Sequence, residues 1–272
     1  MRKEVSLFLE YKFRDFTDDE LKYPKAFFVM ASLEKLNEQR VQQIKRLGFK
    51  FGISLVSFPG ANICPVSSEG KNYLLKNVGD ALIWNPDVIW FDHLRFEGKW
   101  ERLKNELVGT HIGCEFCKGK DRTLVIKDLA QNLREEIPSN IKIGYFAVPC
   151  TSRDFEGRLQ TELGQNHSQL CNIFDYVSPM LYHRMINKPV SYIGEYIGYL
   201  ASLKMKAKIL PIVQLKDMPD DLDDKLTLTE IKEEVRQALT PPSIGVAVFS
   251  WDQTIGKDKI AGVAKILNSI NQ

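Results

Sequence analysis

Short apolar runs and longer amphipathic stretches alternate along the whole chain. The apolar runs are rich in Val, Ile and Phe, and the longer stretches carry apolar residues at helical spacing. This alternation is typical of βα units around a parallel sheet. The expected strands cover residues 4–11, 26–31, 50–58, 87–92, 142–149, 174–182, 207–214 and 244–251. Because eight such strands make a closed ring, we predict an α/β fold of the (β/α)8 TIM-barrel type.

Segments with helical periodicity lie between most of these strands. The link between the first two strands is too short and polar for a full helix. Gly48 and Pro138 mark the ends of helices, and Thr227 with Glu230 predicts a capping box. The sequence has no internal repeat and no Ser/Gly-rich linker, so we expect residues 1–272 to form a single domain. The expected helices cover Leu33–Leu47, Lys71–Leu82, Leu124–Glu136, Ser191–Leu203, Thr229–Leu239 and Lys257–Ile270.

Composition narrows the class of protein. The chain has 272 residues, of which 44% are hydrophobic and 26% charged, which is ordinary for a globular protein of barrel size. Its net charge is +2, and the sequence has neither a block of five like charges nor an apolar run of membrane-spanning length. We therefore expect no nucleic-acid and no membrane partner. Five cysteines fit a reducing compartment, so the chain as written reads as cytoplasmic, or as secreted if a leader was removed.

The carboxyl ends of the strands are the places to look for chemistry, because barrel proteins carry their functional groups there. Alternate side chains of a strand point to opposite faces, which predicts that Glu10, Tyr182 and Gln214 face the inside of the barrel. In the last strand one parity points Trp251 inward and the other presents Asp252. The pattern leaves these two alternatives open.

The residue types at these strand ends suit carbohydrate chemistry. Cleavage of a glycosidic bond needs one carboxyl group that protonates the leaving oxygen and another that acts as nucleophile or as base for water. Asp92 is the first candidate for the second role, with Glu10, Glu97 or Asp252 as the acid. Aromatic rings fit sugar faces and fixed donors bind hydroxyls, which makes substrate-binding candidates of Tyr182, Trp251, Arg95, His183 and Gln214.

Three segments resemble a known group of barrels. Pro86–Phe96, PDVIWFDHLRF, resembles the "dGIwlDyiRfP" strand of glycoside hydrolase-like TIM barrels. Asp175–His183 is similar to the "D-x-v-s-P-M-x-Y" strand of the same group and, more distantly, to the "M-x-Y" strand of family 18 chitinases. Gly245–Asp252 is similar to their closing strand. The resemblance implies a carbohydrate-active barrel in which Asp92 is the candidate catalytic residue and Arg95 the matching arginine.

The departures from the family pattern leave two functions open. The acid of the chitinase motif would fall at Leu94, so a chitinase mechanism is not implied, and Glu97 replaces a common proline. The first hypothesis is a glycoside hydrolase that acts on an oligo- or polysaccharide without a cofactor. The alternative is a non-catalytic carbohydrate-binding barrel. A second carboxyl group near Asp92 would favour the enzyme.

A cysteine pair follows the fourth strand. Cys114 and Cys117 have a spacing that can bind zinc, and His111 lies three residues earlier. A site with four ligands would need Cys64, Cys150 or another distant group in addition. We therefore predict no metal from the sequence, and keep Cys114, Cys117 and His111 as candidate ligands for a third hypothesis, a hydrolytic metal site.

Overall fold

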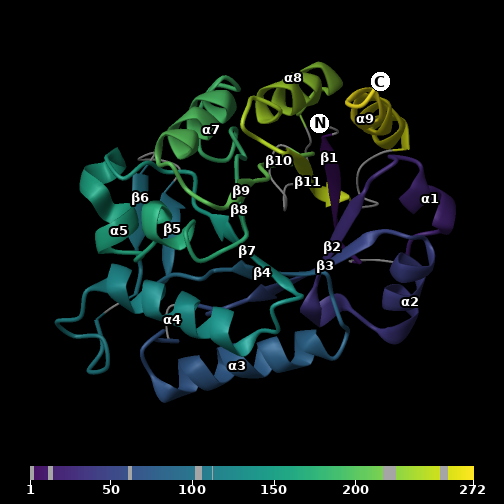
Figure 1. The fold of residues 1–272 in the computed structure, drawn as a ribbon. Coiled ribbons are helices and arrows are strands. Elements are labelled where there is room, and N and C mark those ends of the chain that lie inside the picture. Colours follow the sequence, from purple (N-terminus) through teal and green to yellow (C-terminus); the bar gives the residue numbers. More distant parts are fainter. Residues whose placement is uncertain are drawn as a thin grey trace.

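A ring of parallel strands forms the centre of the protein (Figure 1). The computed structural model describes residues 3–11, 15–60, 63–101, 106–111, 113–216, 225–251 and 257–272. Within these residues the main sheet has nine strands, each parallel to its neighbours. Their order across the sheet is β10 (Ile212–Gln214), β11 (Gly245–Trp251), β1 (Glu4–Leu9), β2 (Phe28–Ser32), β3 (Lys50–Val56), β4 (Val88–Asp92), β7 (Lys142–Ala147), β8 (Tyr176–Pro179) and β9 (Lys208–Ile209).

The seventh expected strand closes the ring, although it is divided into β9 and β10. Pro211 has no N–H group, so regular pairing is interrupted there. Main-chain bonds continue on both sides: the Leu210 N–H donates to the Val177 carbonyl at 3.0 Å, and the Ala247 N–H donates to the Pro211 carbonyl at 2.8 Å. The two pieces together join β8 to β11. Eight strand positions therefore form the (β/α)8 barrel that the sequence predicts.

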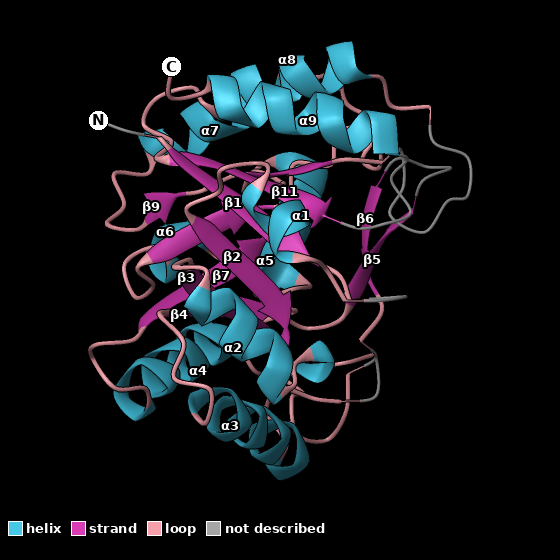
Figure 2. Cartoon of the chain, turned by 90° about the vertical axis from the view of Figure 1, so that its right-hand side faces the viewer, coloured by secondary structure: helices cyan, strands magenta, loops and turns pink. Residues whose placement is uncertain are grey.

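Helices surround the ring on its outer face (Figures 1 and 2). The six expected helices are all present, and the link between β1 and β2 holds only the five-residue α1, as expected. No helix in the described parts of the chain is long and apolar enough to cross a membrane. The helices are α1 (Asp18–Lys22), α2 (Glu38–Arg46), α3 (Ser68–Leu82), α4 (Arg122–Glu136), α5 (Arg158–Thr161), α6 (His167–Leu170), α7 (Tyr192–Ser202), α8 (Leu228–Ala238) and α9 (Lys257–Ser269), with short 3-10 turns at η1 (Leu33–Lys35) and η2 (Asp154–Gly157).

Two helix starts differ from the expectation. Asn37 divides the helix expected over residues 33–47, because its side chain accepts a hydrogen bond from the Arg40 N–H at 2.9 Å and caps α2. Thr227 caps α8 by accepting from the Glu230 N–H at 3.2 Å. The other half of the predicted capping box is replaced, because the Glu230 carboxylate pairs with Arg184.

An antiparallel hairpin that the sequence does not predict follows β4. It consists of β5 (Gly98–Glu101) and β6 (Glu106–Gly109), and it lies on the side of the barrel to which the strand arrows point (Figure 2). The His111 N–H donates to the Glu97 carbonyl at 3.2 Å and closes the base of this hairpin. The hairpin thus extends the carboxyl face of the barrel, where the functional groups are expected.

Alternating side chains separate two apolar layers. In β1, Leu7 and Leu9 pack between the sheet and the helices, whereas Phe8 points into the ring. Trp90 is the largest ring of the interior and stacks on Phe146, with 5.6 Å between ring centroids. The interior layer consists of Phe8, Phe28, Met30, Val88, Trp90, Phe146, Tyr182, Leu210, Ile212, Ile244 and Ala247. The interior of the barrel is therefore a packed core.

We expect Gly144→Ala to lower the free energy of unfolding by about 1–3 kcal/mol. A Cβ atom on Gly144 would lie 2.5 Å from the Trp90 ring, which the packed interior prevents from moving away. Gly79→Ala is the matched control, because nothing lies within 4 Å of a Cβ there and alanine favours the helix by up to about 1 kcal/mol. Urea unfolding of both variants tests this. Equal stability of Gly144→Ala and the wild type would contradict the packing described here.

Candidate functional site

A groove opens at the carboxyl ends of β1, β3 and β4 and continues outward between η1 and α3. Its volume is about 580 Å³, within the usual size range of small-molecule sites. The barrel contributes its inner wall through Phe8, Glu10, Ser54, Asp92 and Phe249. Two of the predicted catalytic carboxylates, Glu10 and Asp92, therefore share one groove.

Asp92 is the last residue of β4, and its side chain is half-buried. A sharp turn follows at once, because His93 adopts a φ of 51°, a conformation that is uncommon for a residue with a side chain. This turn lets the His93 N–H donate to the Asp92 carboxylate at 2.8 Å. The Ser57 N–H donates to the main-chain carbonyl of Asp92 at 2.8 Å. The carboxylate is therefore held at the rim of the ring by its own turn and by the loop after β3.

Glu10 directly follows β1 and is half-buried at the same rim. Its carboxylate accepts a hydrogen bond from the Ser250 hydroxyl at 2.7 Å. Ser250 can reach Glu10 because β11 has one extra residue opposite β1: Leu7 pairs with Val248, but Leu9 pairs with Trp251. The first and last strands of the barrel thus fix the Glu10 carboxylate together.

The same extra residue moves Trp251 away from the groove. Trp251 is buried in the layer between sheet and helices, and it does not face the inside of the ring as one of the two predicted parities required. Ala247 and Phe249 do point inward, so the parity reverses within the last strand. Asp252, the residue presented by the other parity, lies outside the described residues.

Tyr182 lies in the interior layer beside the groove. Its ring stacks on Phe249, with 5.5 Å between centroids and 28° between planes. Burial raises the pKa of Tyr182 well above its usual value, and the nearby charges of Asp92 and Glu10 raise it further. The phenol therefore stays protonated at neutral pH and keeps a hydrogen-bond donor close to two carboxylates.

Arg95 and Glu97 lie in the loop after β4, and neither lines the groove. Arg95 is buried and donates to the Gly98 carbonyl at 3.1 Å, which ties the loop to the start of β5. The Glu97 carboxylate lies 3.5 Å from His93 Nδ1, and this contact lowers the pKa of Glu97. A lowered pKa keeps Glu97 ionised at neutral pH, which disfavours it as the proton donor.

His183 and Gln214 hold loops together outside the groove lining. His183 Nδ1 lies 2.8 Å from the Glu234 carboxylate and Nε2 lies 3.0 Å from Glu230, both on α8. Gln214 accepts from the Arg184 N–H at 3.2 Å and donates to the Lys216 carbonyl at 2.5 Å. His183 thus connects the loop after β8 to α8, and Gln214 connects the same loop to the residues that follow β10.

The outer wall of the groove is a stripe of α3 that the sequence reading missed. Tyr73, Asn77, Asp80 and Trp84 all line it. Tyr73, Asn77 and Asp80 follow one another at spacings of four and three residues on one side of α3, and Trp84 comes just after the end of this helix. The sequence pattern treats this helix only as structural. This mixture of aromatic and polar residues on one helix face is a signal that could have pointed to a ligand surface.

The three candidate metal ligands also come together. His111, Cys114 and Cys117 meet Cys64 from the loop before α3, and the four ligand atoms all lie within 4.8 Å of one another. Cys150, the other cysteine considered as a distant partner, is buried near Leu159 instead. None of these five residues lines the groove.

Comparisons with known proteins agree with this architecture. No protein-family model and no curated protein matches the sequence. The fold is similar to the PgaB (BpsB) glycoside hydrolase domain from Bordetella bronchiseptica, with a TM-score of 0.71 and 11% identity over 100% of this chain and 99% of that one. It is also similar to the spore cortex-lytic enzyme SleL of Bacillus cereus (TM-score 0.64, 10% identity, 99% of this chain and 74% of that one) and to the chitinase ChiC of Aspergillus fumigatus (0.60, 10%, 93% and 92%). The resemblance to glycoside hydrolase barrels is thus confirmed at the level of the fold.

The pair of His183 and Glu234 makes stability depend on pH. Burial raises the pKa of Glu234 to about 7. Burial alone would lower the pKa of His183, but its contacts with Glu234 and Glu230 raise it above the usual value. In both cases the folded state binds protons that the unfolded state has lost, so stability is greatest at low pH and falls as pH rises from about 5 to 8.

We expect Glu234→Gln to flatten this fall by about 1–3 kcal/mol, because glutamine keeps the shape but cannot ionise. Glu233→Gln is the control on the same helix, since its contact with Arg236 lowers the pKa of Glu233 to about 2, outside this pH window. Urea unfolding at pH 5, 6, 7 and 8 measures both variants. Equal slopes in the wild type and Glu234→Gln would show that the pair does not titrate as described.

Proposed function

We propose that the chain is a glycoside hydrolase that acts on an oligo- or polysaccharide. The observation that carries this proposal is the placement of Asp92 and Glu10 in one groove at the carboxyl ends of β4 and β1. Such a second carboxyl group is what separates a hydrolase from a barrel that only binds sugar. The fold similarity to glycoside hydrolases supports the same class, and the chemistry is argued from this site.

The two carboxylates suit different roles. Asp92 is held by the His93 N–H and is open to the groove, which suits attack on the sugar or activation of a water. Glu10 is the other predicted catalytic carboxyl group that lines the groove, and it is our choice for the acid that protonates the leaving oxygen. The Ser250 hydroxyl fixes its position. The protonated Tyr182 hydroxyl would donate to an oxygen that gains charge between them.

The shape of the groove favours a chain of sugars over a single ring. It runs from the rim of the barrel to α3, where Tyr73 on the helix and Trp84 just after its end offer aromatic faces. Aromatic rings stack on the apolar faces of sugars, and Asn77 and Asp80 offer hydrogen bonds to hydroxyls. We therefore infer that the bond to be cleaved binds at Asp92 and that neighbouring sugar units bind along α3.

We also infer that residues 1–272 act as one domain in a reducing compartment such as the cytoplasm. β1 pairs with β11, so the first and last strands belong to the same ring and cannot separate without opening it. The compartment is inferred from the cysteine pattern, an odd number of cysteines of which only Cys114 and Cys117 are close in sequence.

We expect Asp92→Asn to reduce turnover of the substrate at least about 100-fold and to leave binding nearly unchanged, because only the charge is lost. Glu10→Gln should have a similar effect, because glutamine cannot deliver a proton to the leaving oxygen. Asp128→Asn, an exposed carboxylate on α4 away from the groove, is the control. A glycan library screened for both hydrolysis and binding provides the substrate and both measurements.

The results separate the two hypotheses. Full turnover by Asp92→Asn would overturn the assignment of this residue. Binding of glycans by the wild type without any turnover would favour the non-catalytic carbohydrate-binding barrel. If turnover is found, the anomeric configuration of the first product, measured by NMR, decides between nucleophile and base for Asp92.

A further inference from the structure

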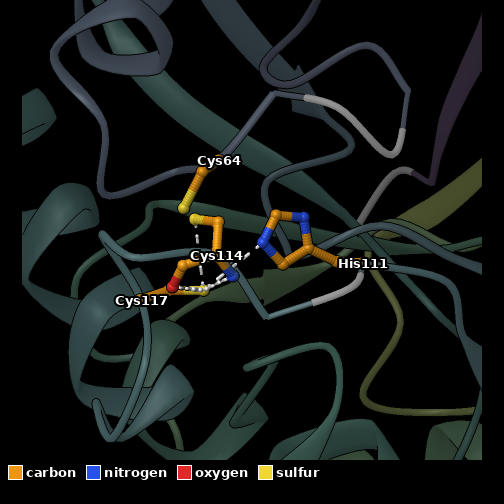
Figure 3. Close-up of side chains that lie close together, drawn as sticks. All are labelled: Cys64, His111, Cys114 and Cys117. Carbon is orange, nitrogen blue, oxygen red and sulfur yellow. Dashed lines mark hydrogen bonds between the residues drawn. The ribbon is translucent and has the colours of Figure 1, made fainter.

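Four metal-binding side chains from two separate segments meet on the carboxyl side of the barrel. Cys64 comes from the loop between β3 and α3, whereas His111, Cys114 and Cys117 come from the segment between β6 and α4. Figure 3 shows the three sulfur atoms and the imidazole turned toward a common centre. We propose that these residues bind one zinc ion, which holds the two segments together.

The distances fit a tetrahedral ion. Zinc–sulfur bonds of about 2.3 Å and zinc–nitrogen bonds of about 2.0 Å place two sulfur ligands about 3.8 Å apart, and a sulfur and a nitrogen about 3.5 Å apart. The Cys114 and Cys117 sulfur atoms are 3.6 Å apart, and Cys117 Sγ lies 3.4 Å from His111 Nε2. The ring nitrogen that faces the cluster is thus already at ligand distance from its neighbour. Small movements of the side chains would complete the site.

The backbone around the cysteine pair is built as a tight turn. The N–H groups of Cys117 and Lys118 donate to the Cys114 carbonyl at 3.2 and 3.0 Å, and the Cys114 N–H donates to Cys117 Sγ at 3.4 Å. Gly119, with a φ of 71°, turns the chain away toward α4. N–H groups that point at sulfur stabilise the negative charge of a thiolate, which is the form that binds a metal.

The other two ligands are fixed from outside. The Ser67 hydroxyl donates to the Cys64 carbonyl at 2.8 Å and joins this residue to the first turn of α3. The His111 ring packs against Phe96, with 5.3 Å between centroids, and its carbonyl accepts from Arg122 at 3.3 Å. Hydrogen bonds and packing contacts of this kind orient the residues that bind the ion in metal sites. The same contact places the positively charged guanidinium of Arg122 beside the site, where three thiolates would add negative charge.

The donor set points to zinc and to a structural role. Three thiolates and one imidazole are a ligand set of closed, four-coordinate zinc sites, which leave no position for a reacting water. His111, Cys64 and Cys117 are buried, and the cluster is separate from the carboxylates of the groove. This argues against the third hypothesis, in which the cysteine pair would form a hydrolytic metal site. On binding, three thiols would release three protons to the solvent and Zn²⁺ would take their place.

The ion would act as a cross-link beside the groove. The loop that carries Cys64 also supplies Pro59 to the groove lining, and its first residue, Ser57, donates to Asp92. The segment that carries the other three ligands directly follows the β5–β6 hairpin, which itself follows β4, the strand that ends at Asp92. A zinc ion would therefore hold the loops after β3 and β4 at a constant distance on either side of Asp92.

Metal analysis of the full-length protein, purified under reducing conditions without chelators, tests this proposal. We expect about one zinc per chain in the wild type and in Cys150→Ala, whose cysteine is buried elsewhere. Cys64→Ser and Cys117→Ser should retain less than about one fifth of that zinc, whereas His111→Cys should keep it as a four-cysteine site. Removal of zinc from the wild type should lower Tm by about 5 °C or more.

Two further measurements keep the test independent of folding and of enzyme activity. Circular dichroism shows which variants fold, and Co²⁺ bound to the wild type should give the intense visible and sulfur charge-transfer bands of a tetrahedral thiolate site. Wild-type protein without zinc after incubation with Zn²⁺ and dialysis would overturn the proposal. Full zinc content in folded Cys64→Ser would overturn the assignment of Cys64 and with it the cross-link. None of these results depends on whether the protein hydrolyses a glycan.

Discussion

Closure of the strand ring is the constraint on which the rest of the structure depends. The divided seventh strand binds β8 through the Leu210 N–H and β11 through the Pro211 carbonyl, so the last strand is brought beside the first. Only this arrangement lets Ser250 bind Glu10, which lies 240 positions earlier in the chain. Closure also turns all the strand ends to one rim, where Glu10 and Asp92 come to share a groove.

Strand and helix positions could be predicted because they depend on local periodicity. The eight expected strands and six expected helices are present, and Tyr182, which strand parity predicts to face inward, lies in the interior layer just after β8. Parity failed in β11, because an extra residue between Val248 and Trp251 reverses the alternation. A bulge of this kind depends on the neighbouring strand, so no pattern within the strand itself reveals it.

The candidate site was predicted in part, for a similar reason. Asp92 and Glu10 follow apolar strands, which is a local signal. Tyr73 on α3 and Trp84 just after it form a groove wall only when η1 packs opposite them. Cys64 is 47 residues from the nearest of its three companions in the sequence, so its place in the cluster is a result of tertiary structure alone.

Several residues that suit sugar binding by type are instead used to satisfy buried groups. A buried guanidinium, imidazole or amide needs partners, and in this barrel they are nearby carbonyls and carboxylates. Arg95 donates to the Gly98 carbonyl, and His183 contacts two glutamates of α8. Gln214 forms hydrogen bonds with two backbone groups. Residue type alone cannot separate these roles from ligand binding, because the same donors suit both.

Around Asp92, the buried polar groups hold the loops and the groove carboxylates can face a ligand. Two carboxylates face the groove: Asp92 accepts a hydrogen bond from the His93 N–H, Glu10 accepts one from the Ser250 hydroxyl, and both are half-buried and open to a ligand. The groups with many partners lie behind them and hold the loops. This arrangement is suited to chemistry, because the positions of the reacting carboxylates are set by the loops around them.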